Sequence, residues 1–214
     1  MNQHKGNSLF KKTKTGKWSK MANIEGPFTT GYTHIRGYYE AATYLADIAL
    51  SSESYDREKL IHPICFNYRH FIELSLKELI KNTQDLYSKS KELGYHVMDI
   101  EEEDLDVSNT HSLLRLLGYF GILLAGVSEE KISSKAVETI NHFHQMDPNG
   151  VKFRYPFNQK GESNFLTLEE YDIENLKTEM ASLKSHFDGV DGWVGYHQSI
   201  AADLLREYSS YQQG

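Results

Sequence analysis

Arg69, Glu73 and Lys77 are the charged residues most suited to chemistry, because they stand four residues apart inside the apolar run 62–80, HPICFNYRHFIELSLKELI. On a helix, about 100° per residue places Arg69 and Glu73 on the arc of the apolar side chains, with Lys77 at its edge. A charge that faces a core must be paired and hydrogen-bonded. We therefore expect this helix to carry an internal ion-pair network or the floor of a binding site.

His111 and Arg154 are the candidate catalytic residues. His111 stands at an expected helix start, where a neighbouring hydroxyl or amide could fix one ring nitrogen and leave the other for acid–base work. A capping or core role is the alternative. The Arg154 guanidinium could reach Glu73 or Asp147 as a structural clamp, or offer its donors to a phosphate.

Tyr155 and Phe153 flank Arg154, and their rings could stack on a nucleic-acid base or seal the core. Six polar or aromatic residues of these segments are the candidate ligand-binding residues: Arg69, Glu73, Lys77, His111, Arg154 and Tyr155.

Several other chemistries lack the residues they need. The chain has no Gly-rich phosphate loop, no cysteine pair and no Gly-x-Ser-x-Gly turn. His142 and His144 would point about 200° apart on a helix, so they are poorly placed to share a metal. We expect neither a metal site nor a cofactor, and we expect the lone Cys65 to be a buried apolar residue.

Composition indicates a chain that folds in water. Among 214 residues, 39% are hydrophobic and 12% aromatic, enough for a core, and no apolar run approaches the length of a membrane span. We expect a cytoplasmic protein without membrane contact. The net charge is −7, yet residues 1–27 hold six lysines and one glutamate. We expect a flexible basic arm there, and an acidic remainder unsuited to broad binding of duplex DNA.

Helical periodicity dominates the chain and predicts the all-α class. The expected helices cover about 30–51, a segment from near Asp56 or Pro63 into the 80s, a segment from a Thr110 cap, about 129–146, and a last region from a capping box at 167–170. The last region should run over about 168–187 and 193–208, with a kink or break at Asp188-Gly189 or Asp191-Gly192.

These helices should form a single helical domain over residues 28–214. The polar stretch at about 88–109, with its acidic cluster at 101–104, reads as an exposed insertion. Residues 150–166 combine aromatic side chains with turn residues, which favours a short extended excursion across the bundle.

Three short segments resemble the HEPN superfamily: YRHFIELSLKELI at 68–80, THSLLRLL at 110–117, and Phe-Arg-Tyr-Pro at 153–156. The resemblance implies a bundle of four or five helices, often dimeric. It also implies a protein that binds or cleaves RNA, or partners a nucleotidyltransferase, in bacterial defence or toxin–antitoxin systems. RNA or a nucleotide, a cognate protein and a second copy of the chain are therefore the expected partners.

One departure from that family concerns catalysis. Its ribonucleases carry an arginine followed after four to six residues by a histidine, late in the bundle, whereas Arg154 is followed by no histidine before His186. Arg57 and His62 fit the spacing but precede the matching helix. Three hypotheses remain: an RNA- or nucleotide-binding module, a metal-independent endoribonuclease with a non-standard site, and a purely structural protein-interaction domain.

Overall fold

The computed structural model is an array of α-helices. It describes residues 22, 30–95, 100, 107, 109–165 and 170–212. Within those ranges there are helices and no strand, so the predicted all-α class is confirmed. The helices are α1 (Gly31–Ser51), α2 (Ser54–Glu92), α3 (Leu113–Val127), α4 (Ser134–Met146) and α5 (Ile173–Gln212).

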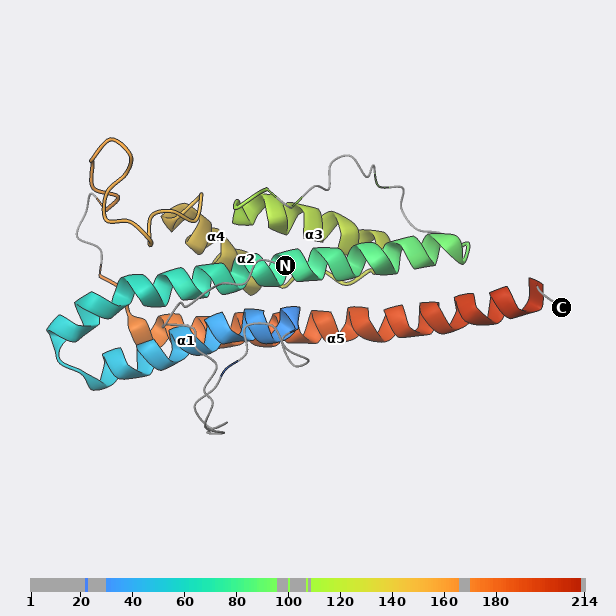
Figure 1. Ribbon diagram of the computed structural model, residues 1–214, viewed down its shortest axis with the longest axis horizontal. Helices are drawn as coiled ribbons and strands as arrows, with labels where there is room; N and C mark the ends of the chain where they lie inside the picture. The colour runs from blue at the N-terminus through green and yellow to red at the C-terminus, as the bar shows by residue number, and fades with distance from the viewer. Residues whose placement is uncertain are drawn as a thin grey trace, which may run out of the picture.

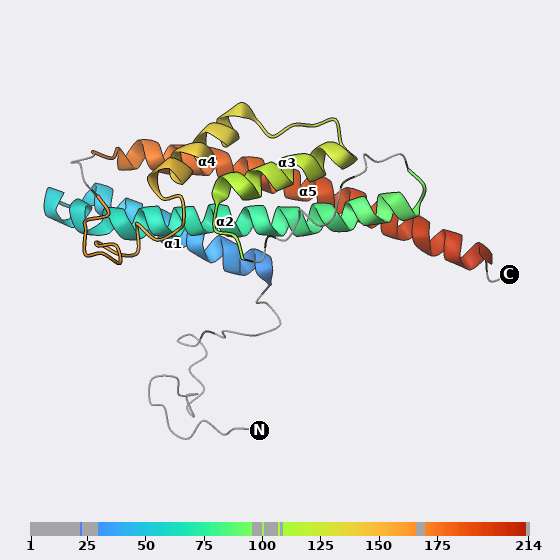
Figure 2. The ribbon, with the colours of Figure 1, turned by 90° about the horizontal axis from the view of Figure 1, so that it is seen from above.

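The long helix α2 lies at the centre of the array, with α3 and α4 on one side and α1 and α5 on the other (Figure 1). Figure 2 shows the same helices from above, with α5 running past the end of α2. Helix α2 packs against α1, α3 and α5, and it buries Ile64, Tyr68, Ile72, Leu76 and Ile80. This packing fixes the position of α2, and with it the position of the polar side chains that α2 carries.

The first two helices follow the expected pattern closely. Helix α1 covers almost the predicted range, and Thr30 and Thr33 close a capping box at its start. Helix α2 begins at Ser54, near the expected Asp56, while Pro63 lies inside the helix and does not start it. The Asn67 side chain donates to the Pro63 carbonyl at 2.7 Å. The helix runs unbroken past this proline to Glu92.

The starts of α3 and α4 correct the sequence prediction. Ser112 caps α3 by accepting from the Arg115 N–H, so the predicted Thr110 cap is wrong by two residues. Helix α4 begins after Ser133 and not near 129. The Ser128 hydroxyl instead accepts the Glu130 N–H in a turn. A serine followed by acidic residues occurs in turns as well as in caps, because both use the same local hydrogen bond.

Helix α5 is continuous, so the predicted break at its two Asp-Gly pairs is wrong. Asp191 accepts a hydrogen bond from Asn82 of α2, and Asp188 pairs with Lys184 one turn earlier. These contacts and the buried Phe187 and Val194 offset the helix cost of the glycines, about 1 kcal/mol each. The helix begins at Ile173, and most of the predicted capping box at 167–170 lies outside the described residues.

Residues 150–165 connect the end of α4 toward α5. We expected a short extended excursion here. Among the described residues of this segment, the extended structure is a single antiparallel bridge between Phe157 and Ser163. The basic arm at 1–27 and the acidic cluster at 101–104 lie outside the described residues, apart from Ala22. No described helix is long and apolar enough to cross a membrane.

Candidate functional site

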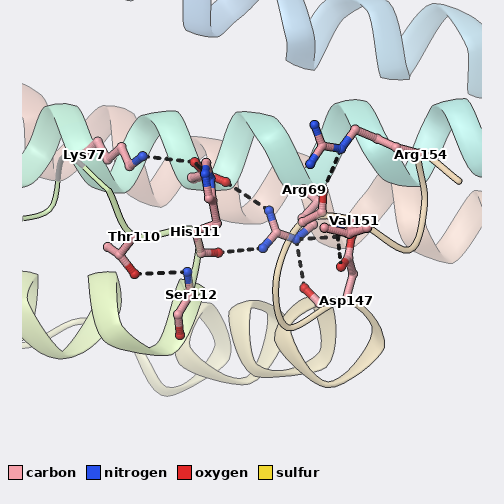
Figure 3. Close-up of polar contacts among 10 residues, drawn as sticks. Arg69, Lys77, Thr110, His111, Ser112, Asp147, Val151 and Arg154 are labelled. Atoms are coloured by element: carbon pink, nitrogen blue, oxygen red, sulfur yellow. Dashed lines mark hydrogen bonds and ion pairs between the residues drawn. The ribbon is translucent and has the colours of Figure 1, made fainter. Parts of the chain in front are cut away.

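Arg69 is the centre of the candidate site (Figure 3). Its side chain is buried on α2, as the helical spacing predicted. Nη1 donates to Glu73 Oε2 at 3.0 Å, Nη2 to the His111 carbonyl at 2.7 Å, and Nε to the Asp147 carbonyl at 2.9 Å. The guanidinium thus joins α2 to the segment before α3 and to the end of α4.

Glu73 is buried beside Arg69, which binds its Oε2, while its Oε1 has partners closer to the surface. Oε1 accepts from Lys77 Nζ at 3.0 Å and contacts His111 Nδ1 at 2.9 Å. Burial by itself would raise the pKa of Glu73, but the hydrogen bonds from Lys77, His111 and Arg69 outweigh it and lower that pKa. Glu73 is therefore an ionised carboxylate that holds cations on two sides.

His111 lies over Glu73 with 60% of its side chain exposed. An ionised carboxylate only accepts hydrogen bonds, so the neutral imidazole keeps its proton on Nδ1 and leaves Nε2 as an acceptor. We expected a neighbouring hydroxyl or amide to orient the ring. The orienting group is instead Glu73, from another helix and 38 residues away.

Asp147 is buried and shares its groups between Arg69 and the following turn. Its Oδ1 accepts the Val151 N–H at 2.8 Å, and Oδ2 lies 3.6 Å from Arg69 Nε. Oδ2 has no hydrogen-bond partner among the described residues. The sequence singled out Asp147 as a possible partner for Arg154, and the helix-ending Asp-Pro-Asn-Gly motif was the signal for a tight turn here.

Arg154 is exposed and reaches neither Glu73 nor Asp147, so the predicted clamp is wrong. Its Nε donates to the Gly150 carbonyl at 2.7 Å, and its guanidinium carbon lies 5.7 Å from the centre of the Tyr155 ring. Tyr155 is 54% exposed, whereas Phe153 is buried. The two rings that flank Arg154 thus have different surroundings.

Gly150 lets the turn approach Arg69. Its φ is +71°, and a Cβ at this position would lie 2.7 Å from Arg69 Nη1. Both the backbone angle and the close contact favour glycine. The position of Arg69 therefore depends on a residue 81 positions away, which helical spacing around Arg69 does not reveal.

A group of rings lies along the same helix and was missed by the sequence reasoning. The His70 ring is stacked on Phe66 with 5.8 Å between centres and 8° between planes, and Tyr38 of α1 packs edge-on against His70 at 4.4 Å. Burial lowers the pKa of His70, so this ring is neutral at pH 7. Histidine and phenylalanine four residues apart were the available signal.

For an RNA- or nucleotide-binding module we expect Arg69, His111 and Arg154 to converge on an accessible concavity. Instead, Arg69 is buried, and His111 and Arg154 stand exposed at the surface. Figure 3 shows Lys77, His111 and Arg154 on the same side of α2. The arrangement is a partly cationic surface laid over a buried ion pair.

Comparison of the chain with protein-family models, with curated proteins and with solved structures gave no match. The resemblance to the HEPN superfamily therefore stays a prediction.

We predict that Gly150→Ala destabilises the protein more than Gly161→Ala. Gly161 has a similar φ of +79° but open space where the Cβ would stand, so its substitution tests backbone strain alone, about 1–2 kcal/mol. At Gly150 the new methyl group must also displace the Arg69 guanidinium from its acceptors. Denaturant unfolding of both variants measures the difference, and equal losses would contradict the close contact.

We also predict that the stability gap between wild type and Glu73→Gln depends on pH. A carboxylate with a lowered pKa contributes stability above its ordinary value of 4.5, and that contribution is lost as pH falls through the folded-state value. The gap in unfolding free energy should narrow as pH falls below the ordinary value of 4.5 and through the lower folded-state value. Glu58→Gln, at an exposed position on α2, is the control. A gap that stays constant with pH would contradict the assignment.

Proposed function

We propose that the protein is a HEPN-like module that binds single-stranded RNA or a nucleotide. The observation that carries this proposal is the placement of Lys77, His111 and Arg154 on one side of α2, where Glu73 holds two of them in place. The ammonium of Lys77 and the guanidinium of Arg154 are suitable donors to phosphate oxygens. Arg154 keeps its two Nη groups for a ligand, because its side-chain hydrogen bond to the described residues uses Nε.

The ring group supplies the second element of such a surface. His70 lies seven residues before Lys77, two helical turns away on the same face of α2. The parallel rings of His70 and Phe66 and the exposed ring of Tyr155 are the side chains on which a base would stack. Stacking on aromatic side chains is tolerant of sequence, so we propose a binder with weak base preference.

The charge of the protein fits binding of a single RNA strand better than binding of a duplex. The chain has a net charge of −7, which opposes an extended polyanion, and the proposed surface offers two cations, Lys77 and Arg154. The wider setting that the resemblance implies is part of the proposal: a cytoplasmic homodimer that acts with a cognate protein in bacterial defence or a toxin–antitoxin system.

A second candidate function, a metal-independent endoribonuclease, is favoured by the contact between His111 and Glu73. The carboxylate orients the imidazole so that Nε2 faces solvent as a base. In that reaction His111 takes the proton of a ribose 2′-hydroxyl, and the 2′-oxygen attacks the adjacent 3′-phosphorus to form a 2′,3′-cyclic phosphate. The bond from phosphorus to the 5′-oxygen breaks, and that oxygen takes up a proton from water. Arg154 is the residue placed to hold the phosphate.

We predict that Arg154→Ala weakens binding of a fluorescent single-stranded RNA several-fold. The loss of one phosphate contact should also lower the slope of log affinity against log salt by about 0.7. Lys160→Ala removes an exposed charge from the same segment and should have little effect. Fluorescence anisotropy across a salt titration measures both, for the RNA and for a mononucleotide.

The same preparations test cleavage. His111→Asn keeps an N–H for Glu73 but removes the base, so RNA cleavage that persists in chelator and is lost in this variant would establish the ribonuclease. Binding without cleavage would establish the module alone. Absence of both, with wild-type stability, would overturn the proposal in favour of a structural interaction domain.

A further inference from the structure

A cavity of about 680 Å³ lies between α4 and the first turns of α5. Its floor includes Cys65 of α2, Phe143 of α4 and Phe153, all buried. Burial raises the pKa of the Cys65 thiol to about 12, so this side chain is an uncharged part of the floor. The volume is in the range of small-molecule sites, about 300–1,000 Å³.

The rim of this cavity is acidic. Glu138 and Glu170 are exposed and have no hydrogen-bond or ion-pair partner among the described residues, and Asp172 and Glu179 add two more carboxylates. The lysine on the rim, Lys135, is paired with Glu179 at 2.9 Å, so its charge is already compensated. The free charge at the mouth of the cavity is therefore negative.

We propose that this cavity binds an organic cation, a protonated amine or guanidinium carried on an aromatic or alkyl body. The apolar body would lie on the floor of Phe143 and Phe153, and the cationic group would lie between Glu138 and Glu170 at the rim. The aromatic rings of the floor would pack against the apolar body of the ligand. The charge of the rim excludes nucleotides, so this ligand class differs from that of the RNA surface.

The test compares three probes that share a phenyl body: phenethylammonium, phenethyl alcohol and phenylacetate. Isothermal titration of the full chain at low salt should give the tightest binding for the ammonium, weaker binding for the alcohol and the weakest for the carboxylate. Added salt should weaken binding of the ammonium until its affinity approaches that of the alcohol, and it should not weaken binding of the other two probes. Equal affinities for all three probes would overturn the proposal.

Two variants locate the binding. The double variant Glu138→Gln and Glu170→Gln should weaken the ammonium three- to tenfold and leave the alcohol unchanged, because exposed charge interactions are individually modest. The pair Glu92→Gln and Glu207→Gln makes the same change in net charge at exposed positions outside the cavity and should have no effect.

Asn175→Trp places an indole at an exposed rim position and should abolish binding of both the ammonium and the alcohol. Ammonium binding that survives this variant, or that survives the loss of Glu138 and Glu170 undiminished, would place the ligand elsewhere and overturn the proposal. Circular dichroism and thermal unfolding confirm that each variant is folded before titration.

Discussion

The buried guanidinium of Arg69 is the interaction on which the rest of this structure depends. A charge removed from water is tolerated only when its donors are satisfied, and Arg69 meets this condition with one carboxylate and two backbone carbonyls. The carbonyls belong to His111, just before α3, and to Asp147, at the end of α4. Arg69 also places its positive charge at the C-terminal end of α4, where it interacts favourably with the negative end of the helix dipole. One side chain thereby fixes α2, α3 and α4 relative to one another.

The same requirement shapes the surface above Arg69. Glu73 balances the guanidinium through Oε2, and its Oε1 remains to bind Lys77 and His111. The carboxylate that stabilises the interior therefore also orients the groups that we propose for RNA. This link has a consequence for mutagenesis: Glu73 affects stability and surface chemistry together, whereas Arg154 belongs to the surface alone.

Helical periodicity predicted the parts of this arrangement that lie within one helix. It placed Arg69 and Glu73 in the interior and Lys77 at its edge, because four-residue spacing fixes a face of α2. It did not reveal that His111 contacts Glu73 or that Gly150 contacts Arg69, because these pairs are brought together by the packing of separate helices. The starts of α3 and α4 were misplaced for a local reason, because the Thr110 and Ser128 hydroxyls accept an N–H two residues on in turns, with the same kind of hydrogen bond that caps a helix. The ligand-binding cavity escaped notice because its walls come from α2, α4 and α5 and carry no motif.

A double-mutant cycle on Arg69 and Glu73 tests the central claim most directly. The free energy of unfolding is measured for Arg69→Met, Glu73→Leu and the double variant. Each single change removes one partner of a buried ion pair and should cost about 3–5 kcal/mol, while the double change should cost less than the sum by at least about 1 kcal/mol. Losses that add to within about 0.5 kcal/mol would show that the two side chains contribute independently and would contradict the account.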